Sequence, residues 1–236
     1  MTTDSRPIVR ERYVNLLAEL VADVGAMGER VLATITASIE ALGSLDVARA
    51  QQIIAGDSEI DSNRHEIGEK AFHVLATQQP TAIDLRLVMA AGRVAEELER
   101  IADYCTGIAK LILTMAAEPS GEPQPQITAM SQITLELLRQ ALGAFRDRNV
   151  EVAAAVWLRD DEVDDLYQDF FKFQIEDMLE HKRNVRRGTY MLWIAHNIER
   201  MADRVTNIAE AVAFLVTADV ANWRSQIESE TVPPSF

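Results

Sequence analysis

The sequence predicts an all-α protein made of two tandem antiparallel three-helix bundles, and three observations predict this fold. Apolar residues recur at steps of three and four along most of the chain, without the alternation that is typical of strands. The motif ERIAD, which begins at Glu99, returns as ERMAD at Glu199, and eight of the fifteen positions in 95–109 are identical to those in 195–209. A proline-rich stretch, AAEPSGEPQPQ, lies between the two copies and is typical of an interdomain linker.

The first repeat is expected to contain three helices. The first runs from about Ile8 to Leu42, where apolar residues form one stripe, and Gly43 ends it. Asp46 is a plausible N-cap for a second helix that ends near Ala76, and Pro80 opens the third helix. The stripe of the third helix consists of Leu87, Ala91, Val94, Leu98, Ile101, Cys105, Ile108 and Ile112.

The second repeat is expected to follow the same order. A fourth helix begins at about Ile127, Asn149 caps a fifth helix that reaches about His181, and a sixth helix follows the break KRNVRRG. Stripes of this spacing favour helices packed at ~20° to one another. We therefore place the first repeat at residues 1–117, the linker at 118–126, the second repeat at 127–218 and a C-terminal tail at 219–236.

The composition excludes several classes of function. The formal net charge of −14 disfavours binding to nucleic acid and to anionic lipid, and it favours cations and basic protein surfaces. No stretch approaches the ~18 apolar residues of a membrane-spanning helix, and the N-terminus MTTDSRPIVRERY lacks the apolar core of a signal peptide. The one cysteine, Cys105, cannot form an internal disulfide, so we expect a reducing, cytoplasmic location.

Paired carboxylates mark both repeats. Within each repeated motif the glutamate and the aspartate are four residues apart and share one helix face, and the preceding helix of each repeat carries a second pair with the same spacing. If the two helices are neighbours, each repeat gathers four carboxylates, which are ligands for hard cations. The two quartets are Asp57, Asp61, Glu99 and Asp103, and Asp160, Asp164, Glu199 and Asp203. The alternative is a solvated acidic face whose charge is balanced by Arg100 and Arg200.

Two stretches of the chain resemble the PhoU family of phosphate-signalling proteins. They are QQPTAIDLRLVMAAGRVAEELERIADYCTGIAK and HNIERMADRVTNIAEAV, and the resemblance extends over nearly the whole chain. It implies two three-helix bundles with metal clusters held by (E/D)-x-x-x-D motifs. It also implies a cytoplasmic regulator, often a homodimer, that acts between the phosphate ABC transporter and a sensor histidine kinase.

The family's metal positions are carried over residue by residue. Glu99 and Asp103 match the first motif, Glu199 and Asp203 match the second, and the four aspartates of the preceding helices match the remaining acidic positions. The family often has His after the motif aspartate, whereas this chain has Tyr104 and Arg204, which leaves the number of metal ions per cluster open. Mg, Mn, Zn, Ca and Fe all remain candidate metals.

Three functions compete at this point. The leading hypothesis is a non-enzymatic signalling regulator that binds metal. A metal-dependent hydrolase or oxidase on a helical bundle is the second, although the acidic faces lack a repeated His or Tyr that could serve as acid or base. A metal-free helical scaffold is the third.

Overall fold

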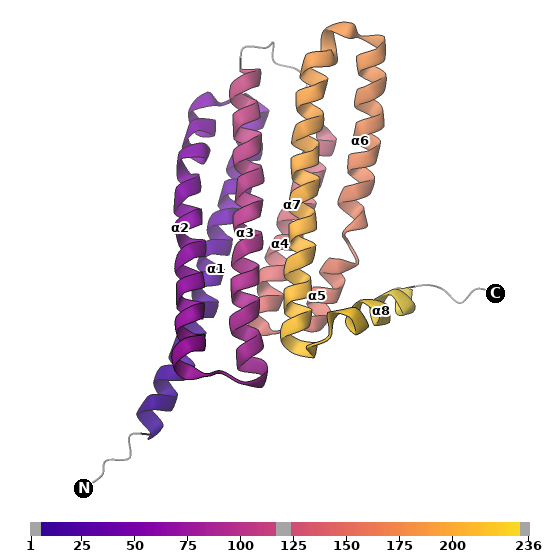
Figure 1. The fold of residues 1–236 in the computed structure, drawn as a ribbon. Coiled ribbons are helices and arrows are strands. Elements are labelled where there is room, and N and C mark those ends of the chain that lie inside the picture. The colour runs from indigo at the N-terminus through magenta and orange to yellow at the C-terminus, as the bar shows by residue number, and fades with distance from the viewer. Residues whose placement is uncertain (1–5, 117–123, 232–236) are drawn as a thin grey trace, which may run out of the picture.

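The computed structural model describes residues 6–116 and 124–231, and these residues form helices without strands (Figure 1). The helices of the first repeat are α1 (Arg6–Ser44), α2 (Val47–Gln78) and α3 (Ala82–Met115). The helices of the second repeat are α4 (Pro125–Asp147), α5 (Val150–Trp157), α6 (Asp161–Glu180), the 3₁₀ turn η1 (Lys182–Asn184) and α7 (Val185–Thr217), and α8 (Val220–Thr231) follows. The all-α fold with two tandem bundles is therefore confirmed.

Local signals begin and end the helices of the first repeat. The side chain of Asp46 caps α2 by accepting a hydrogen bond of 2.9 Å from the backbone N–H of Arg49. Gln79 adopts the left-handed conformation and ends α2, and Thr81 lies at the N-cap of α3. Part of the linker that we placed at 118–126 lies outside the described residues, and α4 begins within it, at Pro125.

The prediction of one continuous helix from Asn149 to His181 is wrong. Asn149 caps α5 as expected, but α5 ends at Trp157 and α6 begins at Asp161. Side-chain contacts hold the intervening turn. Arg159 lies 2.8 Å from Glu136 of α4 and 2.7 Å from Glu162. These ion pairs link the turn to both α4 and α6.

The two bundles share one hydrophobic core. In the centre of the molecule α3 and α7 run antiparallel and pack along their length (Figure 1). The two helices approach closely at Gly107, where a Cβ would lie 3.3 Å from the side-chain nitrogen of Asn197. Polar contacts cross it as well, because Arg86 Nε donates to the carbonyl oxygen of Leu215 over 2.8 Å. The repeats are thus separate in sequence and continuous in packing.

Helix α8 lies in the segment that we assigned to the C-terminal tail. It covers α5, with Trp223 buried and its ring 6.0 Å from that of Trp157 in an edge-on arrangement. Arg224 forms an ion pair with Glu210, a buried residue of α7 that also lies 3.5 Å from Arg93 of α3. Helix α8 thus packs on the second repeat and shares Glu210 as an ion-pair partner with Arg93 of the first repeat.

Candidate metal centres

The first quartet converges at the line of contact between α2 and α3, which we call the α2/α3 seam. Burial raises the pKa of Glu99, and the nearby charges of Asp103 and Asp61 raise it further. Burial also raises the pKa of Asp103, followed by the charges of Asp57 and Asp61. These mutual effects show that the four carboxylates share one electrostatic environment. Asp57 also accepts a hydrogen bond of 3.1 Å from Thr106.

This first cluster is open to solvent and has few cations at hand. Asp57 and Glu99 are half-buried, while Asp61 and Asp103 are exposed. The charges of Arg64 and Arg100 lower the pKa of Glu99, but burial and the acidic neighbours outweigh them. Within the part of the chain that the structure describes, none of the four carboxylates forms an ion pair. The carboxylates repel one another without a bound protein cation to offset the repulsion.

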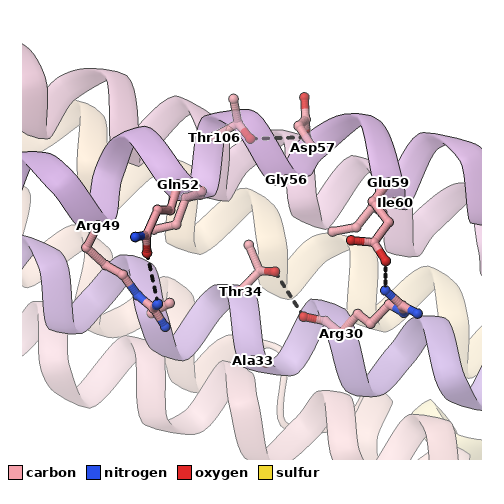
Figure 2. A pocket seen from close by; sticks show the side chains of 12 residues that line it. Arg30, Ala33, Thr34, Arg49, Gln52, Gly56, Asp57, Glu59, Ile60 and Thr106 are labelled. Carbon is pink, nitrogen blue, oxygen red and sulfur yellow. Dashed lines mark hydrogen bonds and ion pairs between the residues drawn. The ribbon is translucent and has the colours of Figure 1, made fainter.

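A pocket of about 270 Å³ opens beside the first cluster, between α1 and α2 (Figure 2). Asp57 and Thr106 lie at its edge, and Arg30 and Arg49 lie on its walls. Each arginine is engaged within the pocket, Arg30 with Glu59 and Arg49 with Gln52. Solvent therefore has a second approach to Asp57.

The second quartet converges along the corresponding contact line of α6 and α7, the α6/α7 seam. Asp164, Glu199 and Asp203 each place one carboxylate oxygen within 4.8 Å of the others. Asp160 accepts a hydrogen bond of 2.8 Å from Thr206, which repeats the contact of Asp57 with Thr106. Among the described residues the carboxylates of Asp164, Glu199 and Asp203 form the one acidic group that is close enough to share an ion. Asp160, beside them, and the four carboxylates of the first quartet, at the α2/α3 seam, do not meet that distance.

The second cluster is more enclosed than the first, since all four of its carboxylates are half-buried. Burial, Asp203 and Asp164, in that order, raise the pKa of Glu199 to about 7. Burial is also the main cause that raises the pKa values of Asp160 and Asp164. Among the described residues Glu199 Oε2 accepts no hydrogen bond, although it is buried and His196 Nδ1 lies 3.2 Å away. A buried carboxylate oxygen without a donor is an available metal ligand.

Two arginines adjoin the second cluster. Arg200 lies 2.8 Å from Asp203, as the alternative of a charge-balanced face predicted, and a hydrogen bond with Tyr104 helps to raise the pKa of Arg200. Arg204 lies 3.9 Å from Asp203 and 3.5 Å from Glu97, a buried residue of α3. Arg100, by contrast, lies 3.8 Å from Glu97 and forms no ion pair with the described first cluster.

The donor sets fit hard cations. Both contain only carboxylate oxygens, and burial together with the neighbouring carboxylates raises the pKa of Asp103 and of Glu199. The two threonine donors, Thr106 and Thr206, were not predicted from the sequence. Their equal position, three residues after the motif aspartate in both repeats, was the available signal.

Comparison with known proteins follows the same division into two repeats. The sequence model of the PhoU domain matches residues 24–112 and 127–212. A phosphate-specific transport system accessory protein PhoU homolog from Rhizobium meliloti is 34% identical over 210 residues, which cover 88% of this chain and 86% of that protein. PhoU homolog 2 from Thermotoga maritima, with the same description, is 39% identical over 77% of each chain.

Solved structures agree with the fold. The phosphate transport system regulatory protein PhoU from Streptococcus pneumoniae superposes with a TM-score of 0.83 at 29% identity, over 89% of this chain and 99% of that one. None of the helices in the described residues has the length and apolar character needed to cross a bilayer.

Proposed function

The chain belongs to the PhoU family, and we propose that it is a non-enzymatic cytoplasmic regulator of phosphate uptake and of the phosphate-starvation response. The observation that carries this proposal is the double match to the PhoU domain, over residues 24–112 and 127–212. The relatives described above, which align with this chain over most of their length, are named as accessory proteins of the phosphate-specific transport system.

The proposed partners are the phosphate ABC transporter and a sensor histidine kinase. The names of the relatives support the transporter, since they describe a part of that transport system. The kinase, the homodimeric state and the cytoplasmic location rest on the resemblance described above. In this proposal the chain links the transporter and the kinase through protein contacts and does not insert into the membrane.

We further propose that each acidic quartet holds metal ions. The residues that would hold them are Asp57, Asp61, Glu99 and Asp103 in the first repeat, and Asp160, Asp164, Glu199 and Asp203 in the second. A bound cation would offset the repulsion between carboxylates on neighbouring helices, so it would stabilise the contact of α2 with α3 and of α6 with α7. The candidate ions are Mg, Mn, Zn, Ca and Fe, and elemental analysis of the purified protein distinguishes them.

The role of metal in this proposal is structural. A catalytic centre requires a positioned acid or base beside an open coordination position. His196 is the closest candidate, because it contacts Glu199, but the corresponding residue of the first repeat is Glu96. The two clusters share their carboxylates but not the neighbouring residue that could act as acid or base. This difference favours a common role in metal binding over a common catalytic reaction.

Deletion of the gene from its host tests the regulatory role. We expect expression of phosphate-starvation genes to rise when phosphate is plentiful, and the wild-type gene should restore repression. Normal repression in a strain without a second copy would reject the proposal. A screen of the purified, metal-loaded protein against phosphate esters tests the non-enzymatic part, and turnover that disappears with Glu199→Gln would reject that part alone.

A further inference from the structure

The two seams differ just beyond their carboxylates. When Asp57 and Asp61 are aligned with Asp160 and Asp164, Gly68 of α2 corresponds to Phe171 of α6. When the two ERxAD motifs are aligned, Gly92 of α3 corresponds to Leu192 of α7. The first repeat therefore has two glycines where the second repeat has an aromatic and an aliphatic side chain.

In the second repeat, rings and aliphatic groups occupy the seam. The ring of Tyr167 lies 6.3 Å from that of Phe171 and 5.9 Å from that of His196, and Leu192 packs against the core. At the end of the seam Met178 packs so closely on Gly188 that a Cβ there would lie 2.8 Å from its side chain. Side chains of the second repeat itself therefore occupy the seam at Phe171 and Leu192, although Phe171 is 44% exposed. Farther along the seam a pocket of about 450 Å³ opens, lined by Gln174, Gly188 and Met191.

In the first repeat the same region is a groove of about 550 Å³, and Phe214 of α7 contributes to its wall. A Cβ added at Gly68 or at Gly92 would meet no atom within 4 Å. Phe72 and Met89, on opposite sides of the groove, are 69% and 53% exposed. Glycine within a helix costs ~1 kcal/mol relative to alanine, and among the described residues no atom lies close enough to either glycine to offset that cost.

We propose that this groove binds the apolar face of a basic amphipathic helix from a partner protein. The partner would supply the large apolar side chains that Phe171 and Leu192 supply in the second repeat. A groove between two helices is a common receptor for such a face, which anchors through residues one turn apart. Seven residues separate Gly68 from Leu75, or ~10 Å along α2, which accommodates two anchors.

Charge identifies the polar side of the partner. Glu96 lies at the groove, and Glu99 and Asp103 continue the same face of α3 toward the first cluster. The one arginine that lines the groove, Arg93, lies 3.5 Å from the buried Glu210 and is engaged there. With a chain charge of −14, these carboxylates favour lysine and arginine beside the apolar anchors.

The probe is a fluorescent peptide of about 18 residues with leucine at every third or fourth position and lysine elsewhere, long enough for five helical turns. Its binding to the full chain is measured by fluorescence anisotropy in a chelating buffer, so that the result does not depend on metal. The variants Gly68→Phe and Gly92→Leu copy the second repeat into the first and leave every charge unchanged. We expect each to weaken binding at least roughly tenfold, or ~1.4 kcal/mol.

The matched control is Gly25→Leu, because a Cβ at Gly25 of α1 also meets no atom within 4 Å but lies outside the groove. It should bind the peptide as the wild type does. If Gly68→Phe or Gly92→Leu folds poorly by circular dichroism, Phe72→Ser and Met89→Ser remove the exposed walls instead and should weaken binding in the same way.

Two results would overturn the inference. Equal affinity of the wild type and the groove variants would show that charge alone attracts the peptide. The second result concerns self-association, measured by sedimentation velocity. If the wild type self-associates, and Gly92→Leu abolishes this while peptide binding is unchanged, the groove binds a second copy of this chain.

Discussion

The two acidic clusters have the same four carboxylate positions and the same threonine donor, but their surroundings differ. The first cluster has two exposed carboxylates, and its four members form no ion pair with the described residues. The second cluster is half-buried throughout, and Arg200 and Arg204 lie within ion-pair distance of Asp203. Among the described residues the first cluster therefore has no arginine paired with its carboxylates, whereas two arginines balance part of the charge of the second.

The residue after the motif aspartate accounts for much of this difference. In the first repeat that residue is Tyr104, which adds no charge and bonds to Arg200 of the other repeat. In the second repeat it is Arg204, whose guanidinium lies between Asp203 and the buried Glu97. Arg204 thus links the second cluster to the contact between the repeats. We expect the second cluster to bind fewer cations than the first.

Removal of Arg204 should have the largest effect on stability. Arg204→Ala leaves Glu97 buried with weaker compensation, and loss of one partner of a buried pair typically costs ~3 kcal/mol. Chemical denaturation of the metal-free protein measures this loss. Arg100→Ala, the matched change at an exposed site, should shift the free energy of unfolding by less than ~0.5 kcal/mol. If both variants unfold alike, the two clusters do not differ in the way proposed.

A second variant separates charge from packing in that result. Adding Glu97→Gln to the Arg204→Ala chain removes the uncompensated charge. The double variant should recover a large part of the lost stability, because a neutral amide costs less to bury than a carboxylate. No recovery would assign the loss to packing of the arginine side chain.

The pKa of Glu199 predicts a pH-dependent effect. In the metal-free fold it is raised from 4.5 to about 7, so the wild-type protein loses stability as the pH rises through this interval. Glu199→Gln should therefore be more stable than wild type above pH 7, by ~1–2 kcal/mol, with the advantage gone near pH 4.5. The measurement is chemical denaturation across this pH range in a chelating buffer. Glu99→Gln, in the more open cluster, should show a smaller gain, and an equal gain would contradict the difference in enclosure.

The threonine donors predict the smallest effect. Thr206→Val and Thr106→Val remove the hydrogen bonds to Asp160 and Asp57 with little change of shape, and each should cost ~1 kcal/mol of stability. Thr114→Val serves as control, because Thr114 is exposed and bonds only to its own helix among the described contacts. Thermal melts of the three variants give the comparison. If Thr114→Val is as destabilised as the other two variants, the hydrogen bonds from Thr106 and Thr206 to the clusters make no specific contribution to stability.

Much of the fold was predictable because its signals are local. Regular apolar stripes specify long helices, and the repeated motif specifies the repeated bundle. The break between α5 and α6 was not predictable, because no glycine or proline marks it. Arg159 within the break pairs with Glu136 on another helix, a contact that the sequence does not reveal. Helix α8 carries a weak signal, since Trp223 and Ile227 are four residues apart and both are buried.

The site shows the same limit. Spacing of four residues predicted that each carboxylate pair shares a helix face, and an antiparallel neighbouring helix carries the second pair of each repeat. The pairing of Arg204 with Glu97 depends on how two repeats pack against each other, which neither repeat reveals alone. Sequence repeats thus predicted what the clusters share, and only the assembled structure shows how they differ.

The most direct test of the two-cluster account is metal binding by the wild type and two double variants. Each protein is stripped with a chelator and titrated with Mn²⁺ in a calorimeter, and the bound metal is then counted by mass spectrometry. The variants are Glu99→Ala/Asp103→Ala and Glu199→Ala/Asp203→Ala. We predict that each loses the metal of its own cluster, keeps that of the other, and that the first loses more ions than the second. Equal metal content in all three proteins would contradict the account and leave the eight carboxylates as an acidic surface without bound metal.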